Sequence, residues 1–176
     1  MKFTETSIPG AFLVEMEPSR DGRGSFGRVF SAKEFHARGL PSDLTEISIS
    51  SNIHRGTLRG MHYQRDPHGE NKLVRVVRGA IYDVIVDLRG GSPADCKWQG
   101  FELSSENGHA LLIPSGCAHG FLTLSDGTDV LYQITDTYEP SAAAGFAWDD
   151  PSLGINWPFS PIVISETDKC RPPFPG

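Results

Sequence analysis

The sequence has no run of 18 apolar residues, so we expect no transmembrane helix. Its first residues, Met1–Thr6, lack the apolar stretch of a secretory signal peptide, and we expect none. The three cysteines, Cys96, Cys117 and Cys170, are widely spaced and form no Cys-x-x-Cys pair, which argues against a disulfide framework or a zinc ribbon. We therefore expect a cytoplasmic protein without a membrane partner.

Linkers, low-complexity tracts and internal repeats are also missing, so residues 1–176 are predicted to form a single domain. This length is sufficient to bury a sizeable core without disulfides. Hydrophobic residues make up 38% of the chain and charged residues 22%, which is typical of globular proteins and argues against disorder.

Positive charge is scarce, and a formal net charge of −6 argues against nucleic-acid binding. The basic residues are nevertheless clustered, since six of the 16 lie between Arg55 and Arg78, where only Asp66 and Glu70 oppose them. Such a cluster on an acidic protein indicates a small anionic ligand, such as a phosphate or a nucleotide. The alternative, that these side chains only solvate the outer faces of strands, is equally compatible with the sequence.

The 19 glycines and 13 prolines predict many turns, and therefore short strands. Segments rich in β-forming residues recur between these turn residues. The predicted strands are Ala11–Met16, Leu44–Ser50, Lys72–Val77, Ile81–Leu88, Trp98–Leu103, Ala110–Ile113, Gly120–Leu124 and Val130–Thr135. This pattern predicts an all-β sandwich, jelly roll or barrel.

One short helix is predicted near the N-terminus, where Ser31 and Glu34 have the spacing of a capping box and Gly39 is suited to end the helix. The tail from Ser141 onward holds six of the 13 prolines, so we expect it to be extended. A helical turn could begin at Ser165–Asp168.

Two stretches resemble the signature motifs of cupins, the small jelly-roll barrels. Pro114, Gly116 and His119 fit the second motif, Pro-x-Gly-x-x-His. In the first motif, His62-x-Gln64 stands where cupins have His-x-His, and Lys72 stands where they have a metal-binding Glu. Because an ammonium group does not bind a divalent cation, we predict a double-stranded β-helix whose metal site has become an organic acid/base site.

His62, Lys72 and Tyr132 are the residues suited to such chemistry. A histidine can take a proton at neutral pH, and an ammonium group can stabilise the enolate that forms when a carbon next to a ketone is deprotonated. A tyrosine on the other face could return the proton. The three residue types together indicate epimerisation or isomerisation, although each taken alone is more often structural.

The chain as a whole closely resembles the dTDP-4-dehydrorhamnose 3,5-epimerase family. Matching segments occur in the family's order from about residue 3 to residue 170. They include Asp21-Gly22-Arg23-Gly24-Ser25-Phe26, Leu58-Arg59-Gly60-Met61-His62-Tyr63-Gln64, Lys72-Leu73-Val74-Arg75, Ala118-His119-Gly120-Phe121, Ile155-Asn156-Trp157-Pro158 and Ser165-Glu166-Thr167-Asp168.

The resemblance implies a cofactor-free and metal-free isomerase that acts on a nucleotide-diphosphate 4-keto-6-deoxyhexose. By analogy with the family, His62 is the base, Asp168 orients it, Lys72 stabilises the enolate and Tyr132 is the acid. Substrate-binding positions implied in the same way are Arg23, Arg28, Arg59, Glu46, Ser48, His119 and Tyr138. The resemblance also implies a homodimer in which both chains touch the nucleotide.

Several positions depart from the family pattern. Glu46 and Ser48 stand where many members have Gln and Asn, Arg28 where some have Glu, and Gln133 where some have Lys; Cys117 replaces an aromatic residue. These changes leave open which nucleotide sugar is used and whether C3, C5 or both are inverted. We weigh three alternatives: a mono-epimerase, a metal-dependent cupin that uses His62, Glu70 and His119, and a non-catalytic sugar-binding protein.

Overall fold

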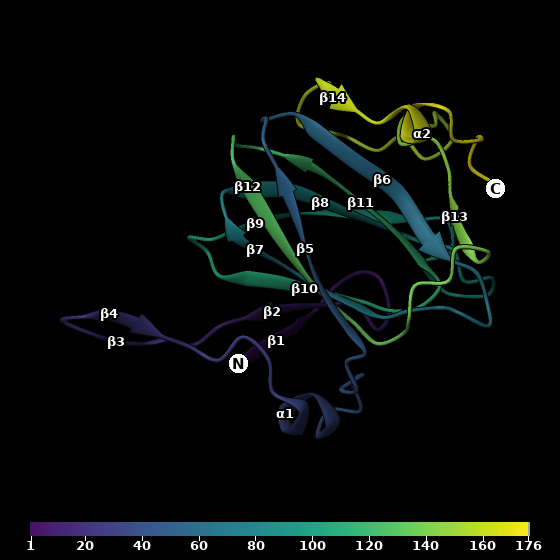
Figure 1. Cartoon of the computed structure of the whole chain (residues 1–176). Coiled ribbons are helices and arrows are strands. Elements are labelled where there is room, and N and C mark those ends of the chain that lie inside the picture. The colour runs from purple at the N-terminus through teal and green to yellow at the C-terminus, as the bar shows by residue number, and fades with distance from the viewer. Residues whose placement is uncertain (176) are drawn as a thin grey trace.

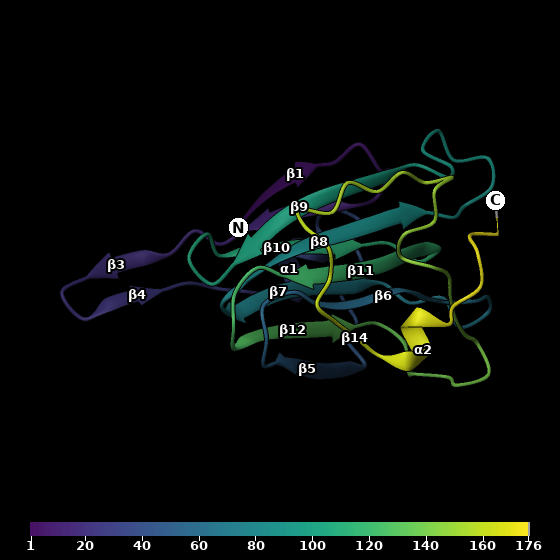
Figure 2. The ribbon, with the colours of Figure 1, turned by 90° about the horizontal axis from the view of Figure 1, so that it is seen from above.

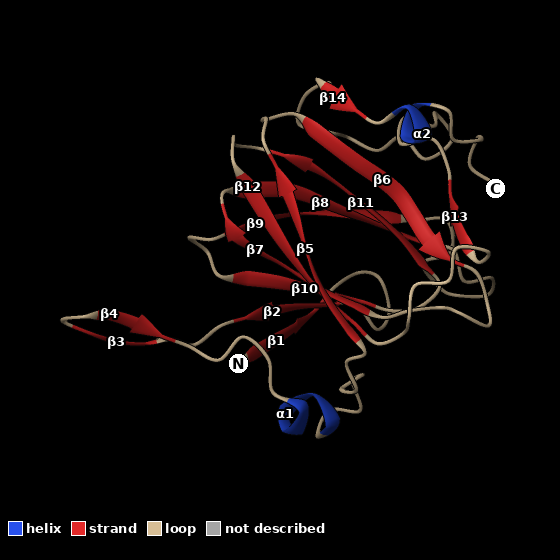
Figure 3. Cartoon of the chain, viewed as in Figure 1, coloured by secondary structure: helices blue, strands red, loops and turns tan. Residues whose placement is uncertain are grey.

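The computed structural model describes residues 1–175, and strands predominate (Figures 1 and 3). The strands of the first sheet are β1 (Lys2–Glu5), β2 (Phe12–Glu15), β5 (Glu46–Asn52), β7 (Lys72–Arg78), β10 (His109–Ile113) and β12 (Thr128–Ile134). Those of the second are β6 (Thr57–Gln64), β8 (Ala80–Asp87), β9 (Trp98–Ser104), β11 (Cys117–Thr123), β13 (Ala143–Gly145) and β14 (Val163–Ile164).

The first sheet has the order β1-β2-β10-β7-β12-β5 and the second β13-β6-β11-β8-β9, while β14 runs parallel to β6. All other pairings are antiparallel, and the two sheets form the predicted cupin-like jelly roll (Figure 1). A separate hairpin of β3 (Ser19–Asp21) and β4 (Gly24–Phe26) projects away from the sheets, as Figure 2 also shows.

The main core lies between the two sheets and consists of the apolar side chains that point inward from alternate positions of the strands. Val74 and Val76 of β7 belong to one buried cluster with Ile81 and Ile85 of β8 and with Phe121 of β11. These side chains are at most 2% exposed. Because successive strand residues point to opposite faces, the same strands also need cover on their outer sides.

Two further clusters provide this cover. On the first sheet, Phe35 of helix α1 (Ala32–His36) packs on Leu73 and Leu112. On the second sheet, Phe146 and Leu153 of the C-terminal segment pack against strand residues. The extended tail thereby covers a sheet face and positions the short helix α2 (Glu166–Lys169) over β6 (Figure 2). Within the described part of the chain, neither helix is long and apolar enough to cross a membrane.

The sequence-based predictions of secondary structure are confirmed for all eight strands and for the first helix. The Ser31 hydroxyl accepts a hydrogen bond from the Glu34 N–H, and Gly39 follows the helix with a φ of 68°. Ser165 caps α2 in the same way, by accepting from the Asp168 N–H at 3.1 Å. The strands that were not predicted are β1, β3, β4, β6, β13 and β14.

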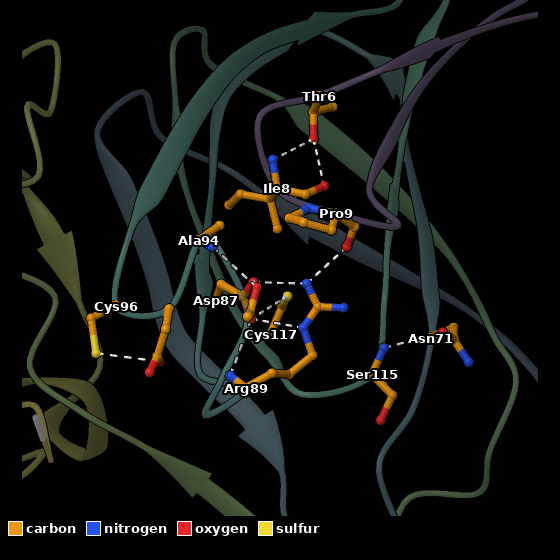
Figure 4. Close-up of polar contacts among 12 residues, drawn as sticks. Thr6, Ile8, Pro9, Asn71, Asp87, Arg89, Ala94, Cys96, Ser115 and Cys117 are labelled. Carbon is orange, nitrogen blue, oxygen red and sulfur yellow. Dashed lines mark hydrogen bonds and ion pairs between the residues drawn. The ribbon is translucent and has the colours of Figure 1, made fainter.

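An ion pair between the buried Asp87 and the half-buried Arg89 lies at the end of β8 (Figure 4). Asp87, at the end of β8, accepts hydrogen bonds from Arg89 Nε and Nη2, both at 2.7 Å, and from Ser92 Oγ at 2.6 Å. Arg89 Nη2 also donates to the Pro9 carbonyl at 2.8 Å, which ties the N-terminal loop to this end. Burial raises the pKa of the neighbouring Cys117 thiol to about 12, so this residue is a buried and inert thiol.

Candidate active site

A cavity of about 410 Å³ opens between the two sheets, where β5, β7 and β12 of the first sheet face β6 and β11 of the second. Its size lies in the range of small-molecule sites. Seven of the residues singled out in the sequence line it: Ser48, Arg59, His62, Lys72, His119, Tyr132 and Tyr138.

His62 and Asp168 form a pair at one wall of this cavity. Residue His62 lies on β6 and Asp168 on α2, and His62 Nε2 is 2.6 Å from Asp168 Oδ1. The imidazole is 40% exposed and the carboxylate 7%. A carboxylate at this distance places the ring proton on Nε2, so the lone pair lies on Nδ1, which has no hydrogen-bond partner among residues 1–175.

The surroundings of Asp168 keep its carboxyl ionised. Burial on its own would raise the pKa of Asp168, but the hydrogen bond and charge of His62, the Gly60 N–H and the guanidinium of Arg171 outweigh burial. The pKa of Asp168 therefore lies below its ordinary value. An ionised partner fixes the ring orientation of His62 and stabilises the imidazolium that forms when His62 takes a proton.

A second pair of histidine and aspartate lies beside the first. His119 of β11 is the register partner of His62, and its Nε2 is 2.6 Å from Asp83 Oδ1 on β8. These side chains are only 5% and 0% exposed. Asp83 was not among the predicted site residues. A charged residue within the apolar run of β8 is the signal that could have identified it.

Two glycines allow this close arrangement of β6 and β11. Gly60 has a φ of 135°, and a Cβ there would lie 2.5 Å from the Cα of Gly120. A Cβ at Gly120 would in turn lie 3.0 Å from the Arg59 carbonyl. Gly60 and Gly120, the glycines of the motifs that contain His62 and His119, are thus explained by backbone contact between the two strands.

Tyr132 belongs to the opposite sheet, where it packs against the core with its ring edge-on to His119. Burial raises the pKa of Tyr132 far above its ordinary value, and the charge of Asp83 acts in the same direction. The phenol therefore keeps its proton at neutral pH and can donate it. Residues His62 and Tyr132 thus face one cavity from different sheets.

Lys72 lies at the start of β7, and its Nζ is 2.9 Å from Glu70 Oε1. Arg59 of β6 donates from Nε to Asn52 Oδ1 at 2.8 Å and keeps its guanidinium at the cavity wall. Sequence reasoning did not identify Asn52 or Arg171 as neighbours of the site, and it considered Glu70 only as a metal ligand.

Three predicted substrate-binding residues lie outside the cavity lining. Arg23 is exposed on the projecting hairpin, where its guanidinium pairs with Asp21 at 2.6 Å. Arg28 is exposed just after that hairpin. Glu46 begins β5, and its carboxylate accepts a hydrogen bond from the Tyr138 N–H at 3.4 Å, near the cavity.

The donors of the alternative metal site are each engaged elsewhere: His62 with Asp168, His119 with Asp83 and Glu70 with Lys72. Across residues 1–175, no three His, Cys, Asp or Glu side chains form a group that could hold a metal ion. The chemistry available from these residues is proton transfer beside an ammonium group.

Comparison with known proteins places this arrangement in a family. A family model described as dTDP-4-dehydrorhamnose 3,5-epimerase matches residues 5–175. An enzyme of that name from Methanothermobacter thermautotrophicus is 44% identical over 98% of this chain and 94% of its own length. A relative from Streptomyces niveus, 35% identical over 96% of this chain and 82% of its own length, is named dTDP-4-dehydrorhamnose 3-epimerase.

Comparison with solved structures leads to the same family. The Bacillus anthracis dTDP-4-dehydrorhamnose 3,5-epimerase with TDP and PPi bound has a TM-score of 0.95 and 38% identity, with 98% of this chain and 99% of that one covered. The Legionella pneumophila enzyme in complex with dTDP-4-keto-L-rhamnose has a TM-score of 0.92 and 35% identity, with 98% of this chain and 92% of that one covered. The family match over nearly the whole chain, together with these relatives, shows that the protein belongs to the dTDP-4-dehydrorhamnose 3,5-epimerase family of isomerases.

Proposed function

We propose that this chain converts dTDP-4-dehydro-6-deoxy-D-glucose to dTDP-4-dehydro-L-rhamnose by inverting C3 and C5, without a cofactor or a metal. The observation that carries the proposal is the placement of a proton acceptor and a proton donor on opposing sheets. His62 and Tyr132 both line the cavity, and Lys72 lies between the sheets with them. A sugar held between the sheets then has a base on one face and an acid on the other.

The reaction follows from these positions. His62 Nδ1 removes the proton from a carbon next to the C4 ketone, and the electron pair of that C–H bond moves onto the ketone oxygen. The ammonium of Lys72 donates a hydrogen bond to the resulting enolate oxygen. Tyr132 then gives its phenolic proton to the same carbon from the other face, which inverts it. Exchange with water removes the proton from His62 and returns one to Tyr132 before the second carbon reacts.

The remaining site residues are proposed to bind the substrate. The guanidinium of Arg59 suits the diphosphate, because its planar fork matches phosphate oxygens. Ser48, His119 and Tyr138 line the cavity and are proposed to contact the sugar. Glu46 lies beside Tyr138 and is proposed to act at the mouth of the same cavity.

Arg23 and Arg28 are proposed to act through a homodimer. The hairpin that carries Arg23 projects from the sheets (Figure 2), and Phe26, the last residue of β4, is exposed. On the edge strand β5, Ile47 and Ile49 are 63% and 62% exposed, although they are apolar. An apolar edge strand and a free hairpin support pairing with a second copy. Sedimentation velocity that finds only the monomer at micromolar concentration would contradict the homodimer.

The decisive experiment is incubation of dTDP-4-dehydro-6-deoxy-D-glucose with the chelator-treated protein in D2O, followed by NMR. Deuterium at C3 and at C5 is expected. Exchange at one carbon alone would favour a mono-epimerase, as the Streptomyces niveus relative is named. Binding without any exchange would overturn the proposal and favour a non-catalytic sugar-binding protein. If the chelator-treated protein shows no exchange and exchange appears when a divalent metal is added, the metal-dependent alternative would be favoured.

The matched variant is His62→Ala. Because the base supplies about 10²–10⁴ of rate, exchange at both carbons is expected to fall by at least about 100-fold. Binding of TDP, measured by calorimetry, is expected to stay within about threefold, since the imidazole acts on the sugar and not on the diphosphate. Exchange that persists at the wild-type rate would remove His62 from the mechanism.

The cytoplasmic location expected from the sequence is also proposed, and the three free cysteines support it.

A further inference from the structure

Glu70 contributes a carboxylate to the cavity wall, and no role in the proposed reaction has been assigned to it. Its Oε1 lies 2.9 Å from the Nζ of Lys72, and the two side chains are 9% and 12% exposed. Its Oε2 accepts a hydrogen bond from Gln64 Nε2 at 3.3 Å. Both oxygens of Glu70 therefore have a partner on the wall of the cavity.

Gln64 fixes this carboxylate in place through hydrogen bonds to it and to the surrounding backbone. It is 5% exposed at the end of β6, and its Nε2 also lies within 3.1 Å of the His68 carbonyl and 3.3 Å of the Thr137 carbonyl. Its Oε1 accepts from the Glu139 N–H at 2.7 Å. One carboxamide thus links β6 to the segment before β7 and to the segment after β12. Glu70 is fixed between this anchor and the ammonium of Lys72.

The charge balance of the cavity makes this carboxylate important. Among the described residues that line it, Glu70 supplies the one carboxylate, whereas Arg59, Lys72 and Arg171 are basic. The Asp168 carboxylate lies beside His62 and 3.7 Å from Arg171, so it balances those groups and leaves Glu70 as the counter-charge of Lys72. The other titratable groups that face the cavity are Arg59, His62 and Tyr63 of β6, His119 of β11, Tyr132 of β12, Tyr138 and Arg171.

We infer that Glu70 is a positioning residue: its carboxylate pairs with the Lys72 ammonium and holds it in one orientation in the cavity. This inference rests on the proposed function. One N–H of Lys72 is directed to Glu70, which leaves two for the enolate oxygen of the substrate. No proton is transferred between Glu70 and the substrate. The carboxylate acts through Lys72 alone.

The test uses the small number of lysines. The chain has five, and the other four, Lys2, Lys33, Lys97 and Lys169, are exposed. The full-length protein is labelled with [ε-¹³C]lysine, and the Lys72 resonance is identified by its absence in Lys72→Met. In Glu70→Gln at pH 7, the ¹³Cε resonance of Lys72 is expected to shift toward those of the four exposed lysines, because the ammonium loses the charge-assisted hydrogen bond that fixes its position.

Kinetics provide the second readout. In Glu70→Gln, kcat for C3 exchange at pH 7 is expected to fall by about tenfold, because an ammonium that is no longer held in place stabilises the enolate less well. The KM is expected to change less than twofold. The control is Glu102→Gln, which removes an exposed carboxylate from β9 and is expected to leave both the Lys72 resonance and kcat unchanged.

A Lys72 resonance at the same position in the wild type and in Glu70→Gln would overturn the inference. This readout needs no turnover, so it decides the role of Glu70 even if the wild type exchanges neither proton and the proposed function fails. Should Glu70→Gln not fold, Glu70→Asp replaces it. That variant keeps the charge but is one methylene shorter, so kcat is expected to fall at every pH. An unchanged kcat in Glu70→Asp would also overturn the inference.

Discussion

Replacing Asp168 with asparagine tests the pairing that makes His62 a base. The change keeps the shape of the side chain but removes the negative charge 2.6 Å from His62 Nε2. The asparagine amide can donate a hydrogen bond to Nε2, and the ring proton would then move to Nδ1, which is the atom proposed to attack the substrate. The variant therefore lacks both the stabilised imidazolium and the correct tautomer.

The magnitude follows from the hydrogen bond. A bond to a charged group contributes about 1.5–3 kcal/mol, and each 1.36 kcal/mol corresponds to a tenfold change in rate. Loss of this one interaction predicts about a 10- to 150-fold decrease in deuterium exchange at C3 and C5. Asp168→Ala is expected to lose less than Asp168→Asn, because alanine cannot hold the ring in the wrong tautomer.

The assay is the initial rate of deuterium incorporation in D2O at saturating substrate, with TDP binding measured in parallel. The matched control is Glu166→Gln on the same helix, which removes an exposed carboxylate that pairs with Lys169 at 2.7 Å. An exchange rate in Asp168→Asn within twofold of the wild type would refute the reasoning. An equal loss in Glu166→Gln would show that disturbance of α2, and not the lost charge, is responsible.

Two further predictions concern the acid and the fold. Tyr132→Phe is expected to lower net inversion more than the initial loss of the C3 proton, since only the returning proton comes from the phenol; equal losses in the two NMR readouts would argue against Tyr132 as the acid. Asp87→Asn is expected to lower the free energy of unfolding in urea by about 1–3 kcal/mol at pH 7. Burial alone would raise the pKa of Asp87, but the hydrogen bonds from Arg89 and Ser92 outweigh burial and hold this pKa below its ordinary value. The difference in unfolding free energy between the wild type and Asp87→Asn should therefore shrink as pH falls from about 5 through the native pKa. A difference that does not change with pH would contradict this account.

Much of the fold could be predicted because local chemistry determines it. The Ser31 cap and Gly39 delimit α1, and the β-forming run of Lys72–Val77 corresponds to β7. Strand β6 was not predicted, because Arg59 and Gly60 interrupt its apolar pattern. The reason for those residues is tertiary: one lines the cavity, and the other lies against the backbone of β11.

The site could be predicted in its residue types but only partly in its pairings. His62 and Asp168 are 106 residues apart, and only the resemblance to a family suggested that they meet. Nothing in the spacing indicates that Asp83 meets His119 or that Gln64 anchors Glu70, because these contacts depend on which strands become neighbours. Ile47 and Ile49 show the same limit, since their alternation with serines predicts a strand but not that both isoleucines are exposed.

The two histidine–aspartate pairs show how burial can separate the roles of similar groups. Both imidazoles lie on neighbouring strands, and each has Nε2 2.6 Å from a carboxylate. A base that reacts at two carbons must exchange its proton with water between steps, and His62, with 40% of its side chain exposed, can do so. His119 is 5% exposed above the fully buried Asp83, so proton exchange with solvent is hindered there. We therefore expect His119 to act as a fixed wall of the sugar site while the proton chemistry takes place at His62.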